Sequence, residues 1–313
     1  MSESDNNVFP AKSPSDLERL SEDQNYFPIR DLSLKTGVNS VTLRAWERRY
    51  GLLKPKRTAK GHRLYGEADV QRVEAILRWI QQGVAVSKVR ALLDQGVSVE
   101  EASSTNEWLA LQNTLIEAAK NYREEKIEQL YQQVFSQYPA AIAIRNWLLP
   151  SFEKLDESAA LACCEMQLIH VLSNRLASVK SQRKKAAKVL VTGLSSQRTL
   201  WCYMAAALLS DKGFVCRVVP NVMQAQDWTA VLNGVQAQGV VAFCGNEQAG
   251  KATELLQQMQ QWHKPVAAIG ASFWLAANDA DMTSLGKVTV YSDALEAVVG
   301  FIEVMESGVI HSQ

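Results

Sequence analysis

The chain has 313 residues, of which 47% are hydrophobic and 21% charged, which excludes a fibrous or largely disordered protein and indicates two or three globular domains. No stretch approaches the roughly 20 apolar residues needed to span a bilayer, and the polar start MSESDNNVFPAK does not resemble a secretory signal, so we expect a cytoplasmic protein without membrane contact. The net charge is zero, but residues 29–95 carry fourteen basic and six acidic side chains, a concentration of positive charge typical of nucleic-acid binding.

The first predicted elements are two short helices that follow a disordered acidic tail over residues 1–25. The segment IRDLSLKT, residues 29–36, ends at a glycine. A second helix starts after Ser40, a good N-cap residue, and runs to Gly51. The turn TGVNS between them has the length that joins helix-turn-helix pairs.

A β-wing is predicted next. The segment LLKPKRTAKGHRLY indicates two short extended arms around a tip at residues 58–61. Apolar residues then recur at helical spacing over residues 67–82 and 87–94, on either side of Gly83. We therefore expect residues 26–98 to form a winged helix-turn-helix DNA-binding domain.

The rest of the chain separates into a helical part and a mixed part. Residues 99–181 show only helical patterns, which suits a four-helix bundle. Over residues 188–307, apolar β-branched runs such as KVLVTGL and GVVAFCG alternate with helical stretches, as in a parallel sheet covered on both faces. The expected fold is multidomain: an N-terminal all-α winged helix-turn-helix, a central helical bundle and a C-terminal α/β flavodoxin-like (Rossmann-type) sheet.

The second helix and the wing carry the side chains that we expect to contact DNA. Arg44 and Arg48 are four residues apart and share a helix face, and arginine pairs with guanine in the major groove or with phosphate. Trp46 is expected in the core, and Glu47 is expected to orient a neighbouring arginine. The wing adds a basic strip suited to phosphate contact or minor-groove insertion. The predicted DNA-contacting residues are Thr42, Arg44, Arg48, Arg49, Lys56, Arg57, Lys60, His62, Arg63 and Tyr65.

These residues lie within a segment, IRDLSLKTGVNSVTLRAWERRYGLLKPKRTAKGHRLYGEADVQRV, that resembles the MerR family throughout. The pattern TLRAWERRYGLLKPKRTAKGHRLY is similar to the subgroup that carries a C-terminal cobalamin-type domain. That subgroup includes light- and B12-responsive repressors of carotenoid synthesis, and curli and biofilm regulators that have lost the cofactor. The resemblance implies a transcription regulator that binds palindromic or repeated double-stranded promoter DNA as a homodimer, with RNA polymerase as a partner.

The cobalamin-type half departs from the family at the cofactor positions. In the family, a histidine in a D/E-x-H-x-x-G loop after the first strand ligates the cobalt. An arginine takes that position here, within LSSQRTLW, and arginine cannot be deprotonated to ligate a metal. The positions that align with the family's cofactor residues are Leu155, Glu165, Met166, Ser196, Arg198 and Trp201. We therefore predict no metal and no cofactor, cobalamin included.

Two kinds of regulator remain open at this point. One is cofactor-free, with a C-terminal domain that serves dimerisation or contact with a partner; the other responds to cobalamin, light or another small molecule. An enzyme is disfavoured, because the sequence shows no nucleophile–base pair, no phosphate-binding loop and no metal cluster. The five cysteines lack CxxC spacing and are expected to be reduced and mostly buried.

Overall fold

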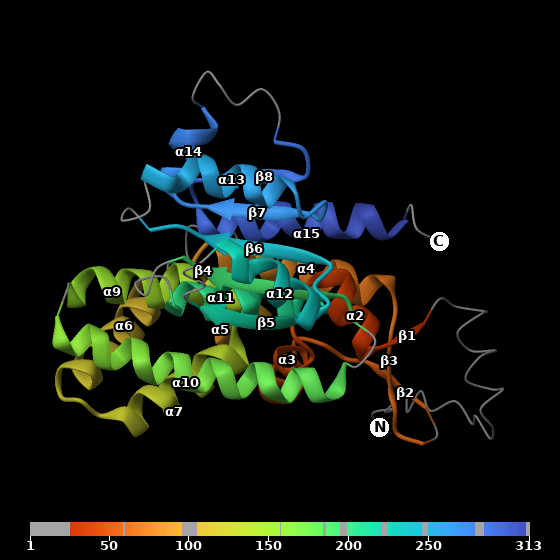
Figure 1. The fold of residues 1–313 in the computed structure, drawn as a ribbon. Coiled ribbons are helices and arrows are strands. Elements are labelled where there is room, and N and C mark those ends of the chain that lie inside the picture. Colours follow the sequence, from red (N-terminus) through yellow and green to blue (C-terminus); the bar gives the residue numbers. More distant parts are fainter. Residues whose placement is uncertain are drawn as a thin grey trace, which may run out of the picture. The chain divides into compact units, whose positions relative to one another are not determined.

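The computed structural model describes residues 26–58, 60–95, 105–156, 158–183, 186–194, 199–220, 225–245, 250–278 and 285–310 (Figure 1). The chain divides into two compact units. The first comprises residues 1–118 and 129–156, and the second comprises residues 119–128 and 157–313. Within the described ranges, no helix is long and apolar enough to cross a membrane.

The first unit contains the predicted helix-turn-helix pair, α2 (Ile29–Thr36) and α3 (Ser40–Tyr50). Gly37 and Gly51 end the two helices with φ angles of 68° and 61°, in the left-handed region that glycine adopts without strain. The predicted N-cap is wrong by one residue. The Asn39 side chain, rather than Ser40, accepts the Val41 backbone N–H at 2.8 Å, which satisfies one of the free donors at the start of α3.

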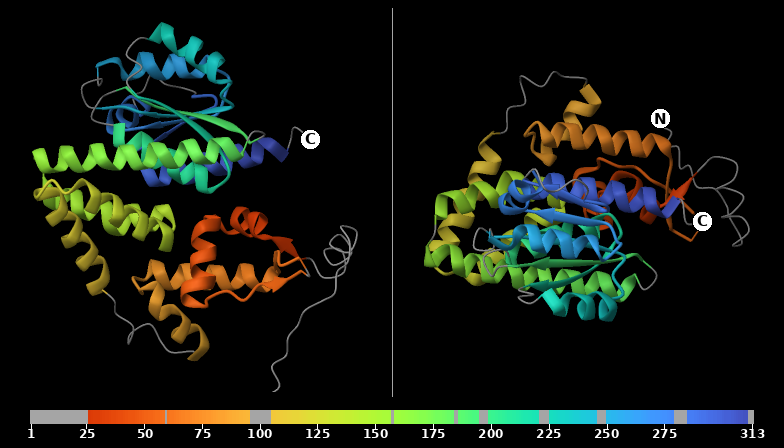
Figure 2. Two further views of the ribbon diagram at one scale, coloured as in Figure 1. Left: turned by 90° about the horizontal axis from the view of Figure 1, so that it is seen from below. Right: turned by 45° about the horizontal axis from the view of Figure 1, so that its top comes forward.

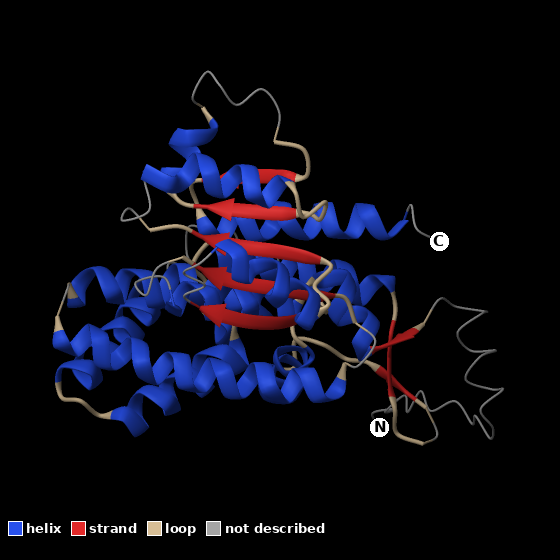
Figure 3. Cartoon of the chain, in the orientation of Figure 1, coloured by secondary structure: helices blue, strands red, loops and turns tan. Residues whose placement is uncertain are grey.

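The wing is a small antiparallel sheet with an additional strand. Its members are β1 (Phe27–Pro28), β2 (Lys56–Arg57) and β3 (Arg63–Tyr65), in the order β1-β3-β2 (Figure 3). The Thr58 N–H donates to the His62 carbonyl at 2.9 Å, which closes the predicted turn between β2 and β3. The strand β1, which the sequence did not predict, pairs with β3 and ties the wing to the start of α2.

Helices make up the rest of the first unit, which shares α6 and α7 with the second unit. A π-helical turn, η2, joins α8 and α9 into one irregular helix. Trp147 of η2 is fully buried and donates its indole N–H to the Leu111 carbonyl at 3.1 Å, so that this helix is fixed against α6. The bounds are α4 (Glu67–Gln81), α5 (Val86–Gln95), α6 (Thr105–Lys120), α7 (Glu124–Gln137), α8 (Ala140–Ala143), η2 (Ile144–Leu148) and α9 (Leu149–Leu155).

The second unit contains the predicted parallel sheet, and its fold class is confirmed. The strand order is β5-β4-β6-β7-β8, and all four pairings are parallel. This is the 2-1-3-4-5 order of flavodoxin-like folds. The strands are β4 (Lys188–Gly193), β5 (Val215–Pro220), β6 (Gly239–Phe243), β7 (Val266–Ile269) and β8 (Val288–Tyr291).

Helices cover both faces of this sheet, as Figure 2 shows in its left view. One face carries a core that includes Leu209 of α11 and Phe301 of α15. The other carries a core that includes Leu256 of α13 and Phe273 of α14. The long helix α10 packs on α11, and an ion pair between Arg175 and Asp211 joins them. The helices are α10 (Ala159–Gln182), α11 (Thr199–Asp211), α12 (Ala225–Val235), α13 (Ala252–Gln260), α14 (Ala271–Ala277) and α15 (Ala294–Ile310).

A glycine at the carboxyl edge of the sheet supports a specific stability prediction. Gly270 has a φ of 138°, and a Cβ there would lie 2.6 Å from the Cys244 carbonyl oxygen. We expect Gly270→Ala to lower the free energy of unfolding by at least about 2 kcal/mol, measured by urea denaturation. Gly234 within α12 has open space around it, so Gly234→Ala should raise that free energy by about 0.5–1 kcal/mol. Equal effects of the two substitutions would contradict this account.

Candidate nucleic-acid interface

The helix α3 has a core side and an outward side. Leu43 and Trp46 are fully buried. Opposite them, positions that are three, four and seven residues apart lie on one face, and Arg48 and Val41 of that face are exposed. We call this outward side the reading face; it comprises Val41, Arg44, Ala45 and Arg48.

Two of the predicted DNA contacts are corrected by the structure. Thr42 is 0% exposed because it lies on the core side of α3, one helical turn before Trp46. Tyr65 is also 0% exposed, and its burial raises the pKa of the phenol to about 12. Neither hydroxyl can reach DNA in this arrangement. Val41 was missed at the sequence level, although its spacing from Arg44 and Arg48 places it on the reading face.

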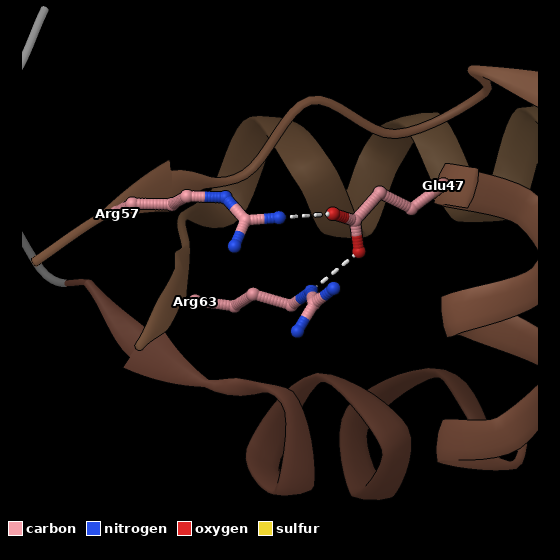
Figure 4. A network of polar contacts seen from close by, with 3 residues as sticks. All are labelled: Glu47, Arg57 and Arg63. Carbon is pink, nitrogen blue, oxygen red and sulfur yellow. Dashed lines mark hydrogen bonds and ion pairs between the residues drawn. The ribbon is translucent and has the colours of Figure 1, made fainter. Parts of the chain in front are cut away.

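Glu47 connects α3 to the wing. Its carboxylate accepts a hydrogen bond from Arg57 at 2.8 Å and another from Arg63 at 2.5 Å, one on each oxygen (Figure 4). The Glu47 side chain is only 11% exposed and that of Arg63 18%, so salt screens the Arg63–Glu47 pair less than the pair with the half-exposed Arg57. The predicted role of Glu47 as an orienting partner therefore has a geometric basis, and the carboxylate orients two arginines rather than one.

The two arginines differ in what they leave available to DNA. The hydrogen bond to Glu47 raises the pKa of the Arg63 guanidinium, and the Arg63 side chain is 18% exposed. The Arg57 side chain is 51% exposed, so part of its guanidinium faces solvent. In this conformation the Arg63 guanidinium serves to hold the wing against α3. Arg57 can hold the wing through Glu47 and also present part of its guanidinium to a phosphate.

The remaining basic candidates lie on the surface of the same unit. Lys60 and His62 are exposed at the tip of the wing, and Arg49 is exposed at the end of α3. The half-buried Lys56 places its ammonium 4.4 Å from the centre of the Tyr26 ring, a distance suited to a cation–π contact. The reading face and the exposed wing cations thus form two basic surfaces, which Glu47 connects.

The positions that align with the family's cofactor residues lie in different environments. Leu155 is buried, and Met166 is 66% exposed on α10. Glu165 is half-buried, and burial raises the pKa of its carboxyl. Trp201 of α11 packs on the sheet, with its ring centre 6.5 Å from that of Phe243. Ser196 and Arg198 lie outside the described residues.

The residues present do not fit cobalt ligation by histidine. The sequence between β4 and α11, residues 194–198, contains no histidine. His170 is exposed and its ring lies 3.1 Å from the Asn174 amide, and His263 follows the end of α13. Burial raises the pKa of the Cys164 and Cys202 thiols to about 12, so both are uncharged thiols at pH 7. The cysteines are free and four of the five are buried, which confirms that prediction.

Comparisons with known proteins find helix-turn-helix regulators among the relatives of this chain. Residues 27–102 match the model of the MerR HTH family regulatory protein. The chain is 31% identical to the HTH-type transcriptional regulator MlrA of Escherichia coli (strain K12) over 76% of this chain and 96% of that protein. It is 29% identical to the HTH-type transcriptional repressor CarH of Myxococcus xanthus, over 36% and 41% of the respective chains. A solved methanol:cobalamin methyltransferase complex, MtaBC of Methanosarcina barkeri, aligns with 76% of this chain and 93% of its own at 12% identity and a TM-score of 0.36.

The correction at Thr42 can be tested by Thr42→Val. Its buried hydroxyl has no hydrogen-bond partner in the described structure, so valine should leave the free energy of unfolding unchanged or raise it by about 1 kcal/mol. Affinity for a duplex that the wild-type protein selects from a random library should change less than about twofold, measured by fluorescence anisotropy. A loss of about tenfold or more would restore Thr42 as a DNA contact.

The role of Glu47 can be tested by Glu47→Gln, with Glu74→Gln on the exposed surface of α4 as the control of equal charge. Release of Arg57 and Arg63 should strengthen binding to unrelated DNA and steepen its salt dependence by up to about one unit of log–log slope per arginine. Because the wing loses its orientation, the preference for the selected duplex should fall about tenfold. Anisotropy titrations at several salt concentrations measure both quantities, and identical behaviour of the two variants would refute the assignment.

Proposed function

The chain belongs to the MerR family of helix-turn-helix transcriptional regulators, and from this premise we propose how it reads promoter DNA. The observation that carries the proposal is that one compact unit holds both the reading face of α3 and the basic wing, with Glu47 as the shared anchor. The proposed ligand is double-stranded promoter DNA, which two copies of the chain bind together.

The dimensions and chemistry of α3 suit the major groove. A helix with its side chains is about 10–12 Å wide, and the groove of B-DNA is about 12 Å wide. Arg44 and Arg48 would donate to guanine or phosphate oxygens, while Val41 and Ala45 offer apolar contacts to thymine methyl groups. The exposed cations at the wing tip, Lys60 and His62, would lie along the backbone or enter the minor groove.

One copy of the chain presents only one short reading helix, so we propose that two copies bind DNA together as a homodimer. Two α3 helices one helical turn of DNA apart, about 34 Å, would read the two halves of a palindromic or repeated site. RNA polymerase is the further partner that we propose, because a regulator bound at a promoter acts on the enzyme that transcribes from it.

For the second unit we propose a role in dimerisation or partner contact rather than cobalamin binding. This rests on two observations. Residues 194–198 contain no histidine, and Trp201, which follows that segment in sequence, packs its indole against the sheet. Because the residues do not fit a histidine-ligated corrin, regulation by that ligand in that mode is not part of the proposal.

Arg44→Ala tests the reading face. We expect affinity for the selected duplex to fall by roughly 1–3 kcal/mol, with a smaller loss for unrelated DNA, measured by anisotropy. Arg145→Ala is the control. Arg145 is exposed in η2 of the same unit and lies far from α3 in sequence, so that its substitution removes an equal charge away from the reading face. Equal losses in the two variants would mean that Arg44 acts only through net charge.

Cobalamin binding is tested directly. Purified protein is mixed in the dark with excess adenosylcobalamin and desalted, and its visible absorption spectrum is recorded. We expect no corrin absorbance to remain with the protein, because no imidazole is available in residues 194–198 to ligate cobalt. Stoichiometric retention would overturn the interpretation of this unit, and DNA binding would then be compared in darkness and light.

A further inference from the structure

Val41 and Arg48 of the reading face are exposed, but one flank of this face lies beside the end of another helix. A pocket of about 230 Å³ is lined by all four reading-face residues, by Arg49 and by Ser136. Ser136 belongs to the last turn of α7, in the same compact unit as α3. The end of α7 therefore stands beside the surface that the proposed function assigns to DNA.

A hydrogen bond holds this helix end in place. The indole N–H of Trp46 donates to the Gln137 carbonyl at 2.7 Å, and Gln137 is the last residue of α7. The final carbonyls of a helix lack partners within the helix, and Trp46 supplies one from α3. Because Trp46 is fully buried, its N–H has no access to water as a substitute.

The next residue adds an apolar anchor. Tyr138 is 1% exposed, its ring centre lies 4.5 Å from that of Trp108, and its hydroxyl donates to Glu107 at 3.0 Å. A buried tyrosine whose hydroxyl has a hydrogen-bond partner contributes buried apolar area, and its hydrogen bond fixes the orientation of the ring. Gln137 and Tyr138 thus fix the end of α7 to α3 and α6 through separate groups.

This arrangement conflicts with insertion of α3 into DNA. A helix of about 10–12 Å diameter fills a major groove of about 12 Å, so no second helical turn fits alongside the reading face. We propose that the last turn of α7 is a latch, closed in this structure, which must withdraw from α3 before the reading face enters the groove. This inference rests on the proposed function.

The chemistry of the latch differs from that of the DNA contact it opposes. The polar side chains of its last two turns are uncharged: Gln132, Gln133, Ser136 and Gln137. It is held by an indole–carbonyl hydrogen bond and by the buried ring of Tyr138, neither of which salt screens strongly. Phosphate contacts by Arg44 and Arg48 weaken steeply with salt. Raising the salt concentration therefore shifts the balance toward the closed state.

Hydrogen exchange with saturating selected duplex tests the latch directly. The Tyr138 amide is bonded to the Val134 carbonyl when the latch is closed. We expect exchange in residues 134–138 to accelerate by a factor of about ten when DNA binds, while α3 becomes protected. Residues 111–118 of α6 are the internal control. Protection of α3 without acceleration at 134–138 would overturn the latch alone, whereas no protection of α3 would overturn the proposed function and the latch with it.

A matched pair of tryptophan substitutions gives an independent test. Trp46→Phe removes the bond to Gln137, and Trp147→Phe removes a comparable bond to Leu111 from an equally buried indole. With concentrations corrected for the folded fraction, Trp46→Phe should bind the selected duplex about two to ten times more tightly than wild type. Trp147→Phe should match wild type. Affinity of Trp46→Phe at or below that of Trp147→Phe would contradict the latch.

Discussion

The DNA-reading half of this protein depends on the burial of one indole. Placing Trp46 and Leu43 in the core fixes the rotation of α3 about its axis, and this leaves Val41, Arg44 and Arg48 on the outside. The indole N–H then needs an acceptor inside the protein, and the acceptor lies 91 positions further along the chain, at Gln137. One buried donor therefore both orients the reading helix and ties it to a helix end outside the helix-turn-helix motif.

Much of the fold could be predicted because its signals are local. Glycines at helix ends, apolar residues at helical spacing and β-branched runs each act within a few residues, and they predicted the helix pair, the wing and the parallel sheet. The strand β1 was not predicted because its two residues, Phe27 and Pro28, are too few to show an alternating pattern. The contact between Trp46 and Gln137 escaped because no local pattern links such distant positions.

The sequence predicted which segments carry the basic side chains of the candidate site better than it predicted which of those side chains face outward. Basic side chains marked α3 and the wing correctly as the charged surface, but residue type alone does not show which side of a helix is buried. Thr42 was assigned to DNA by its chemistry, although Trp46 four residues later places it in the core. Glu47 was recognised as a partner for one arginine, whereas the wing geometry brings two to it.

The length of α7 makes the contact between Gln137 and Trp46 sensitive to the tilt of this helix. Its first residues, 124–128, group with the second compact unit, and its last, 129–137, group with the first. At 1.5 Å per residue, these fourteen residues form a stiff lever about 20 Å long. A tilt of about ten degrees at one end displaces the other by about 3 Å, far more than the few tenths of an ångström that a hydrogen bond tolerates. A small rotation of the lever is therefore enough to carry the Gln137 carbonyl out of reach of the Trp46 indole.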